Sequence, residues 1–360
     1  MKRIIACSDG TWNTPKETDE GVISPTNVSL IHDLIASVDT HGIQQVTFYD
    51  EGVGTDWYDK ISGGLFGMGI NRNIIQAYQF IANYYVPGDE IYLFGFSRGA
   101  YTARSLAGFI RNSGLLRNQY ISSELEKAFL LYKRRDDNSK PDAKEAIEFR
   151  KKYCFENVRI KFIGIWDTVG ELGIPIEVFD VINRDILNCQ FYDVELSSYV
   201  DNAYHALAID EHRKPFLPTL WKQQQRVEGQ QMEQQWFAGV HRDVGGGYNE
   251  HELSDCALRW IIEKANDVGL AFKDISPVVA NPLGEMHDSM SLLYKIFGSK
   301  DRTIGNGPEY NETIAPSVID RINKNIDNYT ANCNPFLTNY ISKNMIQQKV
   351  FSSQNGVKTP

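Results

Sequence analysis

The chain has 360 residues, 42% of them hydrophobic and 23% charged, as in an ordinary globular protein with a substantial core. Its net charge of −9 argues against nucleic acid as a partner and gives no general attraction to anionic membranes. No apolar stretch approaches the roughly 20 residues of a membrane span, and the amino terminus lacks the apolar centre of a signal peptide.

The five cysteines are widely spaced and odd in number, and no C-x-x-C occurs. This spacing indicates neither a zinc site nor a disulfide framework, so we expect reduced thiols and no metal. We find no complete dinucleotide fingerprint or P-loop either, and expect no cofactor. The sequence therefore predicts a cytoplasmic protein, or one exported by a route that needs no signal peptide.

Short apolar runs bounded by turn residues recur along the chain and predict strands buried on both faces. These runs are Arg3–Ser8, Gln45–Tyr49, Glu90–Phe94, Val158–Trp166 and Gln235–Val240. Helical patterns lie between them, at Asn73–Tyr85 and Ser254–Val268. Such alternation predicts an α/β fold, with a mostly parallel central sheet and helices on both faces.

The charged segment 122–152, which includes Lys133-Arg-Arg-Asp-Asp137, predicts a solvated helical insertion near these positions. The apolar rhythm weakens after about residue 300, and we predict a partly disordered tail over 341–360. No stretch has the composition of a linker. We therefore expect residues 1–340 to form a single domain that contains the insertion.

The most informative motif follows the third predicted strand. Residues Glu90–Arg104 read as an apolar strand, a G-x-S-x-G turn and a helix rich in small residues. In this context the turn raises the Ser97 hydroxyl above the sheet and makes it a candidate nucleophile. Gly95 and Gly99 leave room where the strand and the helix approach each other. The alternative is a serine that only caps the following helix.

A serine nucleophile needs a base to accept its proton, and the base needs a carboxylate to hold it. In α/β-hydrolases these partners follow in the order Ser, acid, His, each at the carboxyl end of a strand. Asp167 and His241 each lie just past a predicted strand and fit this order after Ser97. Asp210 is the alternative acid, because it also lies between Ser97 and His241.

Other residues fit the roles of base and acid less well. His287 lies in the loop-like run Glu285–Ser289 and is the second candidate base, but His241 has the strand-end position. Asp243 is close to His241, yet side chains two residues apart on an extended loop point the same way. The other histidines fit worse: His32, His205 and His212 lie in helical patterns, and His41 and His251 lie between polar turn residues.

The tetrahedral intermediate of such a reaction needs backbone N–H donors for its oxyanion. The N–H of Arg98, directly after the serine, is the first expected donor. The second is expected from Asp9-Gly-Thr-Trp-Asn13, at Gly10 or Thr11, where glycine lets the backbone come close. Asp9 then orients this loop or pairs with Arg98, or it ends the first strand in an Asx turn.

Five separated segments together resemble one known family. They are Asp9-Gly-Thr-Trp-Asn13, Tyr49-Asp-Glu-Gly-Val-Gly-Thr55, Gly95-Phe-Ser-Arg-Gly-Ala-Tyr-Thr-Ala-Arg104, Trp166-Asp-Thr-Val169 and Phe237-Ala-Gly-Val-His-Arg-Asp-Val-Gly-Gly-Gly-Tyr248. In this order they resemble the catalytic domain of type VI secretion phospholipase effectors, a bacterial and fungal branch of the α/β-hydrolases. The likeness covers roughly residues 1 to 300.

The resemblance implies a Ser-His-Asp hydrolase of carboxylic esters, with phospholipids as the substrate class. By motif position it implies Ser97 as nucleophile, His241 as base and Asp167 as acid. It allows transient contact with a membrane surface and an immunity or carrier protein as partners. Two alternatives stay open: an esterase or thioesterase with a soluble substrate, and a non-enzymatic binding protein on a hydrolase fold.

Overall fold

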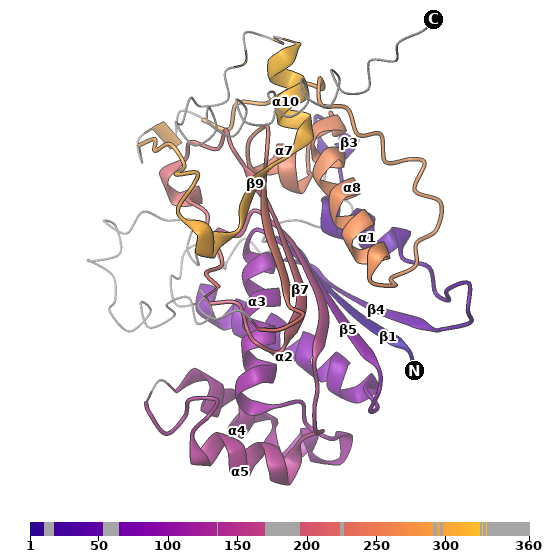
Figure 1. Ribbon diagram of the computed structural model, residues 1–360, viewed down its shortest axis with the longest axis vertical. Helices are drawn as coiled ribbons and strands as arrows, with labels where there is room; N and C mark the ends of the chain where they lie inside the picture. The colour runs from indigo at the N-terminus through magenta and orange to yellow at the C-terminus, as the bar shows by residue number, and fades with distance from the viewer. Residues whose placement is uncertain are drawn as a thin grey trace, which may run out of the picture.

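The computed structural model describes residues 1–10, 18–52, 65–134, 136–169, 195–223, 227–290, 294–295, 298–324, 326 and 329. Its centre is a seven-stranded sheet in the order β4-β1-β5-β6-β7-β8-β9, and every neighbouring pair is parallel (Figure 1). The α/β fold with a parallel central sheet is therefore confirmed.

The strands of this sheet are β1 (Arg3–Ser8), β4 (Gln45–Asp50), β5 (Glu90–Phe96), β6 (Ile160–Trp166), β7 (Val200–Ala208), β8 (Gln231–Phe237) and β9 (Glu312–Ile314). A small antiparallel pair consists of β2 (Thr18–Asp19) and β3 (Val22–Ile23).

The α-helices are α1 (Asn27–Leu34), α2 (Leu65–Tyr84), α3 (Arg98–Ser113), α4 (Ile121–Lys133), α5 (Lys144–Tyr153), α7 (His241–Gly245), α8 (Glu252–Asp267) and α10 (Pro316–Asn323). Within the described ranges, none of these helices is long and apolar enough to cross a membrane.

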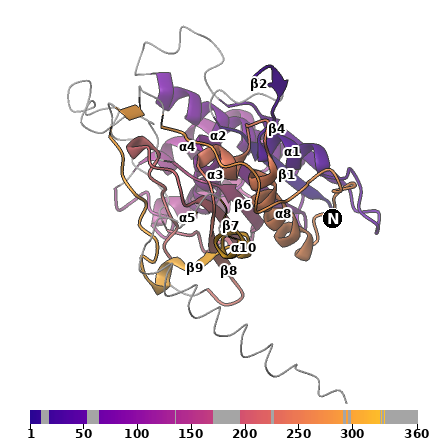
Figure 2. The same cartoon turned by 90° about the horizontal axis from the view of Figure 1, so that it is seen from above.

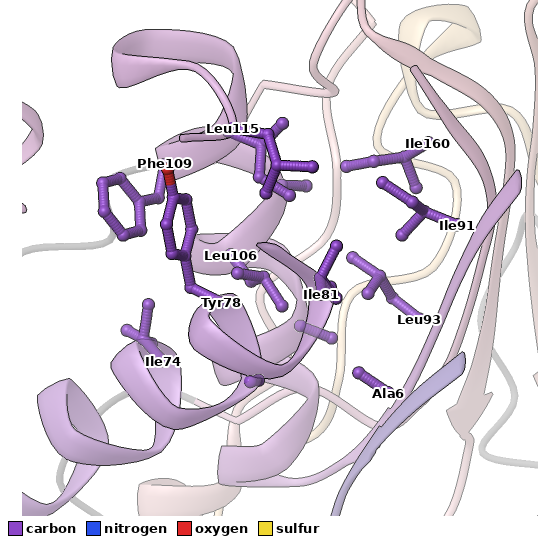
Figure 3. Packing of buried hydrophobic residues seen from close by; sticks show 14 of the residues in the cluster. Ala6, Ile74, Tyr78, Ile81, Ile91, Leu93, Leu106, Phe109, Leu115 and Ile160 are labelled. Atoms are coloured by element: carbon purple, nitrogen blue, oxygen red, sulfur yellow. The ribbon is translucent and has the colours of Figure 1, made fainter. Parts of the chain in front are cut away.

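Helices cover both faces of the sheet, as expected, and each face has its own apolar core (Figures 1 and 2). Strand β1 shows the division, because alternate side chains of a strand point to opposite faces. Ile4 and Ala6 pack in the cluster that contains residues of α2 and α3, part of which Figure 3 shows. Ile5 and Cys7 pack with residues of α1 and α8. Both faces of β1 are thus fully buried, which explains its unbroken apolar sequence.

The elements predicted from apolar runs are present, with shifts at their ends. Strand β1 has the predicted bounds. Strand β8 begins four residues before the predicted strand, and α2 also begins earlier than predicted. Strands β7 and β9 were not predicted. The weakly apolar stretch after residue 300 contains β9 and α10, which its sequence pattern does not indicate.

The charged segment 122–152 contains most of α4 and α5 and is helical, as predicted. It is less solvated than predicted, because α4 buries one face. Ala128, Phe129 and Tyr132 join the same core cluster as α3, and the rings of Phe129 and Tyr132 both contact Phe109. The single domain over 1–340 stays a prediction, and the tail 341–360 lies outside the described residues.

Candidate active site

Ser97 lies at the sharp junction between β5 and α3. It is the residue between the last position of the strand and the first of the helix, and it has φ +58° and ψ −120°. A positive φ is unfavourable for a residue with a side chain, so the turn is strained. Ser97 is nearly buried, and its hydroxyl makes no capping hydrogen bond to the helix. Ser97 therefore does not cap the helix through its side chain, contrary to the alternative prediction.

Two glycines make this turn sterically possible, as predicted. A Cβ on Gly95 would overlap the backbone carbonyl of Gly99. A Cβ on Gly99 would overlap the carbonyl of Ser8, at the end of β1. Strand β5, the start of α3 and the end of β1 therefore meet backbone to backbone around Ser97, and no other residue type fits at either glycine.

The structure brings Asp167 and His241 together. Asp167 directly follows β6, and Nδ1 of His241 donates to its Oδ2 at 2.5 Å. Because an ionised carboxylate only accepts hydrogen bonds, Nδ1 carries the proton and Nε2 of the neutral ring keeps a lone pair. The His241 ring also packs on Phe96, the neighbour of Ser97, with 4.5 Å between ring centroids. Both residues thus lie at the same edge of the sheet as Ser97.

His241 is the first residue of a short helix, α7, rather than part of an extended loop. The predicted extended loop from His241 to Asp243 is therefore wrong, because both residues are helical. Asp243 accepts the N–H of Val240 at 3.0 Å and caps the start of this helix. The glycines that follow allow a sharp turn, because Gly246 and Gly247 have φ of +83° and +110°. Gly245 lies against the Phe96 ring, where a Cβ would overlap it.

A buried arginine from far along the chain also holds Asp167. Arg302 donates from Nη1 to Oδ1 at 2.5 Å and from Nη2 to Oδ2 at 2.9 Å. Both side chains are completely buried. The Ala208 N–H is a second donor to Oδ1, at 3.1 Å. The carboxylate therefore accepts hydrogen bonds from a charged guanidinium, a neutral imidazole and a backbone N–H.

A second ion pair lies beside His241. Oε2 of Glu211 accepts the backbone N–H of His241 at 3.3 Å, and Arg213 binds both Glu211 oxygens at 2.9 and 2.7 Å. The Arg213 guanidinium also lies 3.6 Å from the centroid of Phe216. Phe216 in turn contacts the His241 ring, with 5.0 Å between centroids. His241 is thus enclosed by two aromatic rings and two ion pairs.

These surroundings lower the pKa values of both His241 and Asp167, for different reasons. Burial lowers the pKa of His241, and this outweighs the opposing effect of the hydrogen bond with Asp167. Burial opposes ionisation of Asp167, but the charge of Arg302 and the hydrogen bonds of His241 and Arg302 hold its pKa far below the usual range. At neutral pH the pair is therefore a neutral imidazole and a carboxylate.

The structure places the alternative acid elsewhere. Asp210 accepts the N–H of Gly239 at 2.7 Å and the hydroxyl of Tyr329 at 2.9 Å. Burial raises its pKa, against the effect of these hydrogen bonds. Asp210 therefore stabilises the turn that precedes His241, while Asp167 is the carboxylate that is hydrogen-bonded to the His241 ring.

The competing base, His287, has its own acidic partners. Its Nδ1 donates to Oδ1 of Asp243 at 2.7 Å, and its Nε2 lies 3.5 Å from Glu250. Its ring stacks on Tyr248 with 3.8 Å between centroids. The hydrogen bond to Asp243 is the largest cause of a raised pKa. His287 therefore joins the 281–290 segment to the helix that carries His241.

The predicted helical positions of His205 and His212 are wrong. His205 lies in β7 rather than in a helix, completely buried, and its Nε2 accepts the N–H of Thr168 at 3.1 Å. His212 follows β7 and its Nδ1 lies 3.0 Å from Asp301. The polar residues within β7 hide its strand pattern in the sequence.

The loop expected to supply the second oxyanion donor is described only up to Gly10. The Gly10 N–H donates to its neighbour Asp9 at 2.6 Å, so it is directed to a carboxylate. Asp9 also accepts the hydroxyls of Thr26, at 2.5 Å, and Tyr49, at 2.6 Å, and so ties the end of β1 to α1 and β4. This agrees with a role in orienting the loop. Thr11 lies outside the described residues.

The N–H of Arg98 belongs to the first residue of α3, directly after Ser97. Burial lowers the pKa of the Arg98 side chain to about 10. In the described ranges no group of three or more His, Cys, Asp or Glu side chains could hold a metal ion.

Sequence reasoning missed Arg302, Glu211 and Arg213. Glu211 and Arg213 follow Asp210, and the signal available in the sequence is this charged run directly after an apolar stretch. Arg302 lies in a polar stretch with no local signal, and only the folded chain brings it to Asp167.

Comparison with known proteins places this chain in a family. A family model described as "T6SS, Phospholipase effector Tle1-like, catalytic domain" matches residues 2–264. The "Uncharacterized protein YEL023C" of Saccharomyces cerevisiae is 30% identical over 236 residues, which is 60% of this chain. The chain spans 32% of the length of that yeast relative.

A solved structure, "Crystal structure of an uncharacterized protein from Pseudomonas aeruginosa", aligns with a TM-score of 0.47 and 18% identity over 78% of this chain and 48% of the other. The family match alone spans most of the chain and contains Ser97, Asp167 and His241. The chain therefore belongs to the family of Tle1-like phospholipase effector catalytic domains associated with type VI secretion.

Proposed function

We propose that this protein is a serine hydrolase that cleaves carboxylic ester bonds of phospholipids through an acyl-enzyme. Ser97 is the nucleophile, His241 the base and Asp167 the acid. The observation that carries the proposal is the 2.5 Å bond from Nδ1 of His241 to Asp167, at the sheet edge where Ser97 occupies a strained strand-to-helix turn. Family membership supports the phospholipase type of chemistry.

The reaction follows from the protonation states. The neutral His241 ring takes the proton of the Ser97 hydroxyl at Nε2 while the serine oxygen attacks the acyl carbonyl. Asp167 stabilises the imidazolium that forms. Collapse of the tetrahedral intermediate breaks the bond to the alcohol, which leaves with the proton from His241. Water, activated by the same ring, then releases the fatty acid and frees Ser97.

The oxyanion is stabilised at the start of α3. The Arg98 N–H directly follows the nucleophile, and the positive end of the helix dipole lies at the same place. Gly10 donates to Asp9, so its amide must leave that carboxylate before it can bind an oxyanion. Thr11 stays the other predicted donor from this loop.

The substrate class rests on the family description, which names phospholipase effectors. A phospholipid substrate implies transient contact with a membrane surface, and a toxic effector implies an immunity or carrier protein; both belong to the proposal. So does a cytoplasmic location before export without a signal peptide. A soluble ester or thioester is the second candidate, because the catalytic residues act on any acyl carbonyl.

Labelling with a fluorophosphonate probe tests the nucleophile. The parent should be labelled, and Ser97→Ala and His241→Ala should not. Ser276→Ala is a matched control, because Ser276 is an exposed serine that binds Asp274, and it should be labelled like the parent. Equal labelling of parent and Ser97→Ala would reject the proposal. An unlabelled parent that turns over no ester would favour a non-enzymatic binding protein.

The substrate class needs a separate assay. Release of fatty acid from phosphatidylcholine–phosphatidylglycerol vesicles should exceed hydrolysis of a short-chain p-nitrophenyl ester at equal acyl concentration. A strong preference for the soluble ester would reject the lipid substrate and keep the serine mechanism.

A further inference from the structure

Arg302 lies beyond residues 2–264, the part of the chain that matches the family model, yet it contacts the acid of the proposed triad. It is 135 residues from Asp167 in the sequence and binds both oxygens of its carboxylate. The same guanidinium donates to the carbonyls of Ala208, at 2.7 Å, and Phe216, at 2.6 Å. Four hydrogen bonds therefore fix its plane between two chain segments.

This geometry restricts the rotation of the carboxylate. A guanidinium that binds a carboxylate through two parallel bonds defines the plane of both groups. The orientation of Asp167 in turn determines where Oδ2 meets Nδ1 of His241. Since both ion-pair side chains are completely buried, water cannot replace either bond.

The charges around His241 sum to zero while its ring is neutral. Asp167 pairs with Arg302, and Glu211 pairs with Arg213. These four charged groups bind the ring or its direct partners. Two further titratable groups lie close by: the Tyr294 ring contacts Phe216, and His205, whose pKa burial lowers to about 3, interacts with Asp167. A proton on His241 therefore adds a net positive charge to a buried site, which is unfavourable.

We propose that Arg302 is a positioning residue that aligns Asp167 and cancels its negative charge, so that His241 remains an unprotonated base below neutral pH. This inference rests on the proposed function, because it assigns Arg302 a role in the proton transfer from Ser97. Without the guanidinium, a buried carboxylate would face the imidazole alone, and the pair would take up a proton more readily. The lowered pKa of His241 agrees with this balance.

Three variants separate charge from structure. Arg302→Gln keeps hydrogen-bond donors but removes the charge. Arg302→Lys keeps the charge but loses the two parallel bonds. Arg321→Met is the matched control: Arg321 is also a buried arginine near the end of the described chain, and it donates to the carbonyls of Pro282 and Gly284.

The measurement is a histidine NMR titration of the folded proteins, with His241 assigned by comparison with His241→Gln. Arg302→Gln should raise the pKa of His241 by about 1 to 3 units, and the acid limb of its kcat/KM profile should move upward by the same amount. Arg302→Lys should move the pKa by less than about half a unit and lower kcat by about 10- to 100-fold with KM unchanged. Arg321→Met should titrate like the parent.

A folded Arg302→Gln protein in which the pKa of His241 is unchanged or lower would overturn the proposal. If Arg302→Gln does not fold, Arg302→Lys decides, because a shift above about one unit there would show that retained charge does not set the pKa. The titration needs no turnover, so it can fail or succeed independently of the proposed function, which the Ser97 labelling tests.

Discussion

His241 and His287 each bind an aspartate through Nδ1, at 2.5 Å to Asp167 and 2.7 Å to Asp243. The His241 side chain is 6% exposed and lies among aromatic rings and ion pairs, and burial lowers its pKa. The His287 side chain is 18% exposed, has Glu250 near its second nitrogen, and has a raised pKa. The same pairing thus favours the neutral ring in one place and the protonated ring in the other.

The difference shows that a hydrogen bond to a carboxylate does not by itself make a catalytic base. Arg302 offsets the negative charge of the carboxylate that binds His241, Asp167. His287 instead has a carboxylate near each of its two ring nitrogens, those of Asp243 and Glu250. A neutral imidazole can accept the serine proton, and a cation cannot. His287 is better suited to fasten its segment to α7 than to act in the reaction.

The largest expected difference is in the rate of ester hydrolysis. His241→Ala removes the proposed base and should lower kcat by about 10⁴-fold or more. His287→Ala keeps the base and should lower kcat by less than about tenfold. Initial rates on vesicles or on a reactive ester measure both. Equal losses in two folded variants would mean that the assignment of base and fastening residue is wrong.

Substituting the two aspartates should give the same contrast in kcat as substituting their histidines. Asp167→Asn should lower kcat by about 10⁴-fold, because an amide no longer stabilises the imidazolium. Asp243→Asn should leave kcat within about tenfold of the parent and lower the free energy of unfolding by about 1 to 3 kcal/mol, since buried bonds to Val240 and His287 are weakened. Kinetics and urea unfolding on both variants check the contrast.

Stability should respond to pH with opposite signs at the two histidines. The raised pKa of His287 means that its stabilising contribution is complete below the unfolded value of about 6.5 and is lost as the pH rises through the folded value. The difference in unfolding free energy between parent and His287→Gln should therefore be larger at pH 6 than at pH 9.

For His241 the sign reverses, because burial lowers its pKa and the unfolded chain binds the proton more readily. Its neutral ring therefore costs stability as the pH falls below about 6.5. On acidification His241→Gln should lose less stability than the parent. Urea unfolding across this range measures both effects, and a common sign would contradict the comparison.

The smallest expected effect concerns the ring beneath His287. Tyr248 stacks on it with 3.8 Å between centroids. Tyr248→Leu should lower the free energy of unfolding by about 0.5 to 1.5 kcal/mol and leave kcat unchanged. A large loss of kcat at unchanged stability would give the His287 side of the site a role in the reaction.

Features specified by short stretches of sequence could be predicted. Strand β1 is apolar because it is buried on both faces, and its bounds follow from that pattern. The Ser97 turn could be predicted because Gly95 and Gly99 are needed within five residues. The pairing of Asp167 with His241 was predicted from strand ends alone, with Asp210 left open; the structure places Asp167 on the ring.

The remaining features depend on distant partners. Strand β7 contains Asn202 and His205, whose polar atoms bind Lys161 and Thr168, and this polarity hides the strand pattern. Arg302 lies in a charged stretch that resembles exposed surface until Asp167 meets it. A local pattern carries no information on a bond between residues so far apart, so neither feature could be predicted.

The late position of Arg302 has a consequence for biosynthesis. When the ribosome has released the chain only as far as residue 264, the proposed nucleophile, base and acid are all made, but the guanidinium that accompanies Asp167 is not. An unaccompanied buried carboxylate is strongly unfavourable. The nascent protein therefore cannot complete the proposed catalytic centre until Arg302 has left the ribosome, which delays the proposed activity relative to the synthesis of the matched segment 2–264.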